Sequence, residues 1–292
     1  MRTIFESAKL HSRLPEWFKN RLPEGKTYVN TRSLIDDLQL HTVCESAHCP
    51  NQWECWSRGT ATFMIAGDRC TRACKFCAVN TARPLPLDPD EPRRVAEAAQ
   101  RMKLKHIVIT SVARDDLPDG GAEHFKQTIL WTRRLNPESS IEVLVPDFQG
   151  SIESIKTVLS AQPEIFNHNI ETVKRLTPTV RSKATYERSL NVLSIARKIA
   201  DFRVYTKSGL MVGLGETEEE VVQTMEDLRK VDCDILTIGQ YLRPSEKYLP
   251  VVEYVKPEQF EKYGEIGRRL GFKKVFSGPK VRSSYHAAEI IP

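Results

Sequence analysis

Six of the seven cysteines in this 292-residue chain lie within one short segment of the sequence. They form two groups of three: Cys44, Cys49 and Cys55, then Cys70, Cys74 and Cys77. Clustered thiols in a reducing compartment indicate metal binding or catalysis before disulfides, and the odd total argues against a closed disulfide framework. We therefore predict that both trios bind metal.

The second trio has the spacing Cys70-Thr-Arg-Ala-Cys74-Lys-Phe-Cys77. Three thiolates on a [4Fe–4S] cubane leave one iron open for another ligand. The alternative is a zinc knuckle in which a histidine is the fourth ligand. Zinc sites, however, usually contain two pairs of ligands, with two to four residues between the cysteines of a pair. The spacing favours an iron–sulfur cluster.

Composition and charge narrow the class of protein. Apolar residues make up 40% and charged residues 28%, which is typical of a globular chain. The net charge of +5 is spread along the chain, so it favours an acidic partner without predicting nucleic-acid binding. No apolar run approaches the ~20 residues of a membrane span, and the N-terminus has no secretory signal pattern. We expect a cytoplasmic protein that binds neither membrane nor nucleic acid.

Short apolar, β-rich segments alternate with helix-like stretches along the rest of the chain. The expected strands are 61–67, 106–112, 141–146, 164–170, 204–214 and 234–242, and the expected helices are 92–102, 122–135, 152–159, 186–200, 218–230 and 257–270. This alternation predicts an α/β fold with a parallel sheet, as a partial (βα)6 TIM-like barrel. A doubly wound sheet is the alternative. In a barrel, the chemistry sits where the strands end.

The second trio, with Phe76 before its last cysteine, resembles the signature of the radical S-adenosylmethionine superfamily. The resemblance implies that the open iron chelates S-adenosylmethionine. It also implies that an electron from the cluster releases methionine and a 5′-deoxyadenosyl radical. The fold expected from the resemblance is the radical SAM partial barrel over residues 61–280.

Further motifs resemble the branch of that superfamily that builds the lipoyl cofactor. They are ECWSRGTATFMIAGDRCTRACKFC, SVARDDLPDGGA (111–122), VGLGET (212–217) and VRSSYHA (281–287). The resemblance implies an N-terminal extension, residues 1–60, in which the first trio binds an auxiliary [4Fe–4S] cluster that donates sulfur. It also implies a C-terminal tail, residues 281–292, whose Ser283 is the fourth ligand. On sequence alone Ser284 is an equal candidate, and only the family pattern selects Ser283.

The same resemblance implies a reaction and partners. Sulfur enters C6 and then C8 of an octanoyl chain attached to a lysine of a lipoyl carrier protein. The carrier is the lipoyl domain of a 2-oxoacid dehydrogenase or the glycine-cleavage H protein, and a reductant such as ferredoxin or flavodoxin supplies electrons.

Several other residues are candidates for the site. Asn169 and Glu171 close the fourth strand, where polar residues suit ribose or amino-acid binding. Ser111 follows the second strand and is a candidate for the methionine end, with a simple turn as the alternative. Gly213 and Gly215 resemble the glycine-rich segment near the adenine, or form a tight turn.

Two charged segments complete the set of candidates. Arg282 is expected to shield the auxiliary cluster or to bind substrate. The alternative is that it forms only a surface salt bridge. The adjacent residues Arg114, Asp115 and Asp116 are expected to pair with one another.

Rival functions make different demands on the sequence. A two-cluster electron-transfer protein requires eight cysteines, and a zinc-dependent nucleic-acid module requires tetrahedral ligand sets and a concentrated basic face. Within the superfamily, biotin synthases lack this upstream trio and methylthiotransferases carry an additional domain.

Overall fold

The computed structural model describes residues 14–18, 26–58, 60–200 and 203–284. Parts of the predicted N-terminal extension (1–13, 19–25 and 59) and of the C-terminal tail (285–292) therefore lie outside the described residues. So do residues 201–202, and residues 285–287 of the VRSSYHA motif.

The strands form an open barrel. One eight-stranded sheet has the order β1-β2-β5-β6-β7-β8-β9-β10, in which β1 is antiparallel to β2 and every other neighbouring pair is parallel. The bounds are β1 His41–Thr42, β2 Thr62–Ile65, β5 His106–Ser111, β6 Ser140–Leu144, β7 Ile165–Asn167, β8 Tyr205–Val212, β9 Ile235–Gln240 and β10 Lys274–Gly278. A separate parallel pair joins β3 (Arg69–Cys70) and β4 (Asn80–Thr81).

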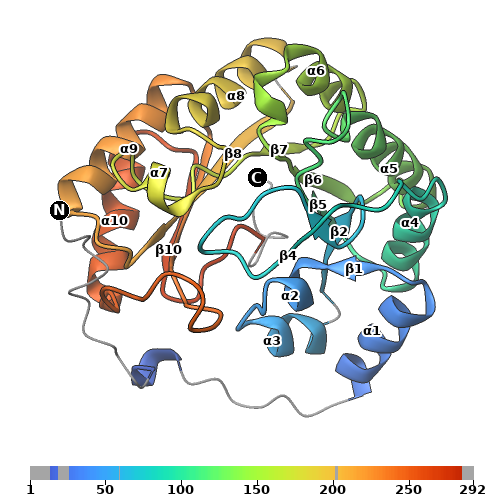
Figure 1. Cartoon of the computed structure of the whole chain (residues 1–292), viewed down its shortest axis with the longest axis horizontal. Helices are drawn as coiled ribbons and strands as arrows, with labels where there is room; N and C mark the ends of the chain where they lie inside the picture. The colour runs from blue at the N-terminus through green and yellow to red at the C-terminus, as the bar shows by residue number, and fades with distance from the viewer. Residues whose placement is uncertain (1–13, 19–25, 59, 201–202, 285–292) are drawn as a thin grey trace.

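Helices cover the outer face of the sheet. Their bounds are α1 Lys26–Asp37, α2 Val43–Ser46, α3 Gln52–Ser57, α4 Glu91–Arg101, α5 Ala122–Leu135, α6 Ile152–Ser160, α7 Thr177–Val180, α8 Tyr186–Ile199, α9 Glu218–Lys230 and α10 Pro257–Arg269, with short 3-10 turns η2 Glu16–Phe18 and η3 Phe148–Gly150. Figure 1 shows α4–α6 and α8–α10 as an outer arc, with α2 and α3 in the gap between β1 and β10.

The partial-barrel prediction is confirmed, and the sheet order excludes the doubly wound alternative because the strands follow chain order without a reversal. The six expected helices are found to within one residue at each end. Thr217 forms a capping box with Glu220 at the start of α9.

The structure adds a seventh parallel strand, β10, which pairs with β9. Its residues are only half-buried, so it lacks the apolar run that marks the other strands.

Apolar side chains fill the layer between sheet and helices. Phe125 and Ile129 of α5 pack with Ile107 and Ile109 of β5, and all four are fully buried. A second cluster joins α9 and α10 to β8 and β9. None of the helices in the described part of the chain has the length and apolar character that a membrane span requires.

The inside of the barrel holds a buried ion pair. Lys207 of β8 lies 2.8 Å and 3.0 Å from the two carboxylate oxygens of Glu142 of β6, and both side chains are fully buried. Asn167 of β7 donates to the same carboxylate over 2.9 Å. Burial raises the pKa of Glu142, but Lys207 and His106 outweigh burial, and the net pKa is below its ordinary value.

We predict that breaking this pair from one side destabilises the fold. Glu142→Leu or Lys207→Met leaves one buried charge without its partner, which costs about 3–5 kcal/mol of unfolding free energy. The double variant, Glu142→Leu with Lys207→Met, removes both charges at similar volume and recovers most of that loss. Urea unfolding at matched iron content measures all three. A double variant as unstable as the two losses summed would contradict the prediction.

Candidate active site

One cavity of about 740 Å³ lies at the carboxyl ends of the strands. Its wall contains all six clustered cysteines, although they come from α2, the turn after it, α3, the end of β3 and the loop between β3 and β4. The other predicted site residues in the wall are Phe76, Ser111, Asn169, Glu171, Arg282 and Ser283. The fold therefore gathers both trios and most of the candidate ligands around one space.

The second trio lies on a short loop, residues 70–77, which we call the cysteine loop. The pairing of β3 with β4 closes its base, and the Cys77 N–H donates to the Cys74 carbonyl over 3.1 Å. Backbone N–H groups also point at sulfur, from Arg72 to Cys70 and from Ser182 to Cys74, each over 3.4 Å. Such donors favour the thiolate form that a cluster requires.

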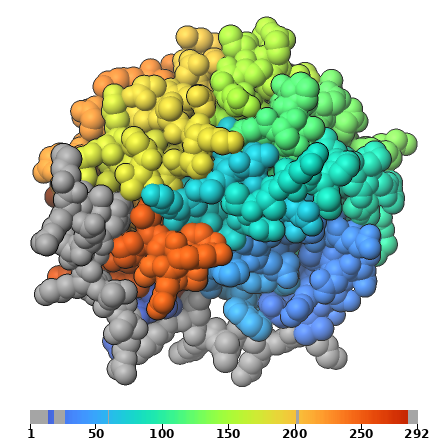
Figure 2. Space-filling view, in the orientation of Figure 1, coloured from blue at the N-terminus to red at the C-terminus, as the bar shows by residue number. Residues whose placement is uncertain are grey.

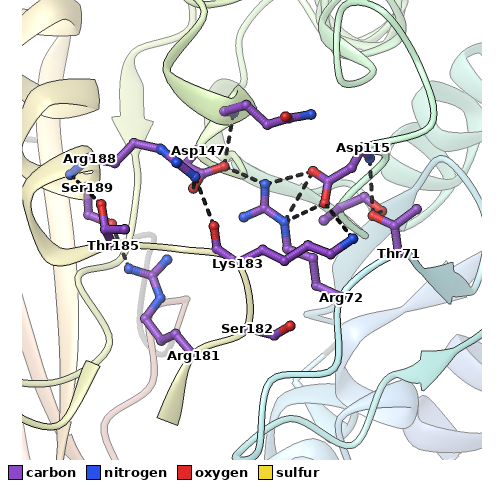
Figure 3. Close-up of polar contacts among 12 residues, drawn as sticks. Thr71, Arg72, Asp115, Asp147, Arg181, Ser182, Lys183, Thr185, Arg188 and Ser189 are labelled. Carbon is purple, nitrogen blue, oxygen red and sulfur yellow. Dashed lines mark hydrogen bonds and ion pairs between the residues drawn. The ribbon is translucent and has the colours of Figure 1, made fainter. Parts of the chain in front are cut away.

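Arg72 holds the cysteine loop against two strand ends (Figure 3). Its guanidinium donates to both carboxylate oxygens of Asp115, after β5, with a shortest distance of 2.7 Å. It also donates to Asp147, after β6, over 2.6 Å. The Arg72 side chain is 6% exposed and that of Asp147 is 0% exposed, so this network is shielded from solvent. Burial raises the pKa of Asp147, but the hydrogen bond and charge of Arg72, together with the Gln149 N–H and the charge of His168, outweigh burial and lower the pKa to about 2.

Further contacts extend this network. The Thr71 hydroxyl donates to the Ala113 carbonyl and accepts from the Asp115 N–H. Arg188 of α8 donates to the second carboxylate oxygen of Asp147 over 3.2 Å. The expectation that Arg114, Asp115 and Asp116 pair with one another is half wrong. Arg114 does bond Asp116 over 2.9 Å, but Asp115 bonds Arg72 of the cysteine loop.

The first trio lies on two short helices beside β2. Thr42 caps α2 by accepting from the Glu45 N–H, which fixes Cys44 on the first turn. Cys49 follows α2, and its N–H donates to the Cys44 carbonyl over 2.9 Å. Cys55 lies on α3, where its N–H donates to Asn51 over 2.9 Å. The two helices thus bring three distant thiols to one wall of the cavity.

Aromatic side chains cover this trio from the outside. Trp56 is fully buried and packs with Cys44 and the half-buried Cys49 and Cys55. Tyr28 of α1 stacks on Trp53 with ring centroids 4.4 Å apart. Trp53 itself is 46% exposed, so it shields the trio only through Tyr28.

Burial raises the thiol pKa at both trios. The pKa of Cys44 is raised to about 11 and those of Cys55 and Cys77 to about 12, and burial is the largest cause at each. Cys74 is shifted in the same direction. A buried thiolate at these positions therefore needs the positive charge of a metal centre beside it.

The segment after β10 forms another wall of the cavity. Asn51 donates to the Lys280 carbonyl over 2.6 Å, which ties this segment to the helices of the first trio. It passes so close to β9 that a Cβ at Gly239 would meet the Val281 carbonyl oxygen at 2.0 Å. Only glycine leaves room for the chain at this point.

The two serines of this segment have different partners. Ser283 accepts a hydrogen bond from Asn169 over 2.7 Å, on the strand-end side of the cavity. Ser284 bonds the Thr62 hydroxyl over 2.8 Å, at the start of β2. Arg282 donates to the Val281 carbonyl over 2.6 Å. Burial lowers the pKa of Arg282 and the charge of Cys49 opposes this shift, so the two side chains lie within electrostatic range of each other.

Three buried polar atoms in the cavity wall lack a partner among the described residues. The Ser111 hydroxyl and the side-chain amide oxygens of Asn51 and Asn169 make no hydrogen bond there. A buried polar group without a partner is costly, so these atoms suit a polar ligand that completes them. Glu171 accepts from Asn169 over 3.2 Å, and burial raises the pKa of Glu171.

Arg181 is a wall residue that the sequence analysis missed. It follows α7, donates to Ser189 over 2.6 Å, and lies within electrostatic range of Glu171 and Cys74. Burial lowers its pKa, while those two groups oppose the shift. No motif marks this arginine in the sequence. Its buried cation is suited to an anionic ligand group.

Gly213 and Gly215 lie outside the residues that line the cavity. Gly213 has a φ of 101°, and its N–H donates to the carboxylate of Glu216. A Cβ there would meet the Gln240 side chain at 2.1 Å, so the turn itself requires glycine. Asn167, one layer below Asn169, belongs to the buried Glu142 network. Asn169 is therefore the asparagine of this strand end that reaches the cavity.

Each trio brings three cysteine thiols to the wall of the cavity. A [4Fe–4S] cubane binds each cysteine at a different iron, so three thiols fit a cluster that keeps one position open for another ligand.

Comparison with known proteins shows that two family models match parts of this chain. The radical SAM superfamily matches residues 64–228, and the N-terminal domain of lipoyl synthase of the radical SAM family matches residues 3–49. The lipoyl synthase of Caldanaerobacter subterraneus subsp. tengcongensis is 58% identical over 275 residues, covering 94% of this chain and 96% of that protein. The lipoyl synthase of Bacteroides fragilis is 57% identical over 279 residues, covering 96% of each.

Solved structures share the fold at low identity. Methylornithine synthase (PylB) has a TM-score of 0.54 at 13% identity, covering 93% of this chain and 77% of that one. HydG, a maturase of the [FeFe]-hydrogenase, has a TM-score of 0.57 at 15% identity, covering 85% and 63%.

We predict that the second trio needs Arg72 to bind metal and that the first trio does not. Arg72→Met removes every hydrogen bond between the guanidinium and the two buried carboxylates, so the cysteine loop loses its anchor. In a background with Cys44, Cys49 and Cys55 replaced by alanine, this change sharply lowers the iron retained after anaerobic reconstitution. Arg72→Lys keeps the charge without the bidentate fork and gives an intermediate loss.

The matched control carries Arg72→Met with Cys70, Cys74 and Cys77 replaced by alanine. Iron held by the first trio is expected to be unchanged there. Equal loss in both backgrounds would show that Arg72 supports the whole fold instead of the cysteine loop.

Proposed function

The chain belongs to the lipoyl synthase family of radical SAM enzymes, and on this premise we propose how its residues divide the work of sulfur insertion. It is an enzyme of the radical SAM, sulfur-inserting type and carries a [4Fe–4S] cluster with S-adenosylmethionine. When bound, these groups supply a radical able to abstract hydrogen from an unactivated alkyl chain, which no amino-acid side chain can do.

We propose that Cys70, Cys74 and Cys77 hold the cluster that binds S-adenosylmethionine. A cluster held there would share the cavity with Ser111 and Asn169, which have buried atoms without partners among the described residues. These atoms are suited to the polar groups of the cosubstrate, with Glu171 beside them, and Arg181 is suited to its carboxylate. Phe76 packs at the edge of the apolar cluster of α9 and α10 and lines the cavity.

Gly213 and Gly215 are proposed to act indirectly, without contacting the cosubstrate. They stand outside the cavity wall, so their contribution is to shape the turn after β8.

We propose that the first trio binds an auxiliary [4Fe–4S] cluster, the sulfur donor, with Ser283 as its fourth ligand. Support comes from the shared cavity and from Asn51, which ties the C-terminal segment to these helices. An oxygen ligand is a harder, weaker partner for a cluster than a thiolate, so it is easily given up. Arg282 is proposed to balance charge at Cys49 and to guard the cluster.

This assignment divides the chain into three parts. Residues 1–60 carry the auxiliary ligands, 61–280 form the radical SAM partial barrel, and 281–292 form the capping tail.

The substrate is proposed to be an octanoyl chain on a lysine of a lipoyl carrier, with sulfur entering at C6 and C8. Apolar side chains line the same cavity, among them Met64, Val112, Leu144, Leu210 and Met211, and they suit an alkyl chain. The carrier is the lipoyl domain of a 2-oxoacid dehydrogenase or the glycine-cleavage H protein. The reductant is a ferredoxin or flavodoxin, and the reaction is expected in the cytoplasm.

The single observation that carries this proposal is that one cavity contains both trios and Ser283. Anaerobic reconstitution is expected to give about eight irons per chain, as two cubanes require. With S-adenosylmethionine, an octanoyl-lysine peptide and a reductant, we expect 5′-deoxyadenosine and a gain of two sulfur atoms on the peptide. Zinc in place of iron would overturn the proposal. Nucleoside release without sulfur transfer would overturn the division of the two clusters.

We predict that Ser283 and Ser284 respond differently to substitution. Ser283→Ala alters the spectrum and iron content of the auxiliary cluster alone, because it removes the oxygen ligand. Ser284→Ala, the matched control, removes only the bond to Thr62 and leaves both clusters intact. Mössbauer or EPR spectra of each variant measure this. An unaltered auxiliary signal in Ser283→Ala, or an altered one in Ser284→Ala, would show that the ligand is assigned wrongly.

A further inference from the structure

Three segments meet on one side of the cavity mouth. They are the cysteine loop, residues 180–183 after α7, and residues 243–248 after β9. The Lys75 N–H donates to the Val180 carbonyl over 2.9 Å, and the Leu249 N–H donates to the Lys75 carbonyl over 3.1 Å. Figure 2 shows these teal, yellow and orange surfaces in contact on the visible face. Side chains from the three segments therefore form one continuous surface.

Four basic side chains on this surface make up what we call the basic rim: Lys75, Lys183, Arg243 and Lys247. Lys75 and Lys247 are exposed and form no ion pair with a described carboxylate. The Lys183 side chain is 62% exposed, and its ammonium stands 3.9 Å from Asp115, which Arg72 already neutralises.

The remaining charges leave the rim positive. Arg243 donates to the backbone carbonyls of Tyr248 and Glu246, and it forms no ion pair with a carboxylate in the part of the chain that the structure describes. The Lys247 ammonium lies 5.1 Å from the Tyr248 ring centre. Glu246 is the acidic residue within the 243–248 segment.

Several basic residues elsewhere on the surface have carboxylate partners. Lys156 pairs with Glu153 over 2.9 Å, Lys174 with Glu187 over 2.8 Å, and Lys262 with Glu218 over 2.6 Å. These pairs neutralise the outer helices locally. Uncompensated charge at the mouth therefore contributes strongly to the field that an approaching molecule meets.

We propose that the basic rim docks an acidic surface of the protein that carries the octanoyl-lysine. This inference rests on the proposed function, because only the acyl-lysine side chain enters the cavity while the carrier stays outside. A carrier face with carboxylates around that lysine would meet the rim and hold the acyl chain in the cavity. Charges at an interface rim act chiefly on encounter rate and salt dependence, and less on chemistry.

The test compares two charge-altered variants of the reconstituted full chain. The rim variant is Lys183→Gln with Lys247→Glu, which places no new carboxylate beside Asp115. The matched control is Lys105→Gln with Lys198→Glu, the same charge change on exposed residues at the opposite end of the barrel. The substrates are an octanoylated lipoyl domain and a short octanoyl-lysine peptide.

For the carrier domain, we expect the rim variant to raise KM about tenfold, while the control variant stays within about twofold of the native chain. Raising ionic strength from about 0.05 to 0.3 M weakens the native reaction with the domain and has little effect on the rim variant. Both variants keep native turnover of the peptide. Replacing the carrier's carboxylates beside the lysine by amides reproduces the rim defect.

Equal KM for the carrier in the rim and control variants would overturn the docking proposal. So would a native reaction that is insensitive to salt. Failure of the native chain to transfer sulfur to the peptide would instead count against the proposed function itself, so the two failures are distinguishable.

Discussion

The contact of Arg72 with the carboxylates of Asp115 and Asp147 holds the site together. The cysteine loop has almost no regular structure of its own beyond the β3–β4 pair, so it cannot fix three thiols by itself. A bidentate guanidinium joins it to Asp115 and Asp147, which stand at the ends of two adjacent strands. The rigid sheet thereby fixes the position of the loop. Because the pair is buried, its attraction is little screened by solvent or salt.

The first trio, Cys44, Cys49 and Cys55, is held by different contacts. Its cysteines lie on two short helices that are attached to the barrel by β1 and by the packing of Trp56. The C-terminal segment closes the same space, tied by Asn51 and admitted by Gly239. Segments from both ends of the chain therefore meet at the cavity. Strand β10 carries the chain back to this edge of the sheet, where the C-terminal segment forms part of the wall of the cavity that both trios line.

Charge is distributed in layers along the barrel axis. Glu142 and Lys207 form a neutral pair in the interior, Asn169 and Arg181 line the cavity above it, and uncompensated lysines stand at the mouth. The interior pair costs desolvation energy but gives strands β6 and β8 a fixed polar contact. The cavity is thus polar where a cosubstrate is expected and apolar where an alkyl chain is expected. The mouth is positive where a carrier protein is expected.

The sequence by itself determined the alternation of strands and helices and predicted two trios of metal-binding thiols, because both depend on local spacing and periodicity. It did not predict β10, whose half-buried residues carry no apolar pattern. Nor could it pair Arg72 with Asp147, because 75 residues separate them. Arg181 gave no signal, since an arginine in a loop has the same local pattern whether buried or exposed. Only the tertiary structure decided which cation meets which carboxylate, because those contacts depend on where the strands end in space.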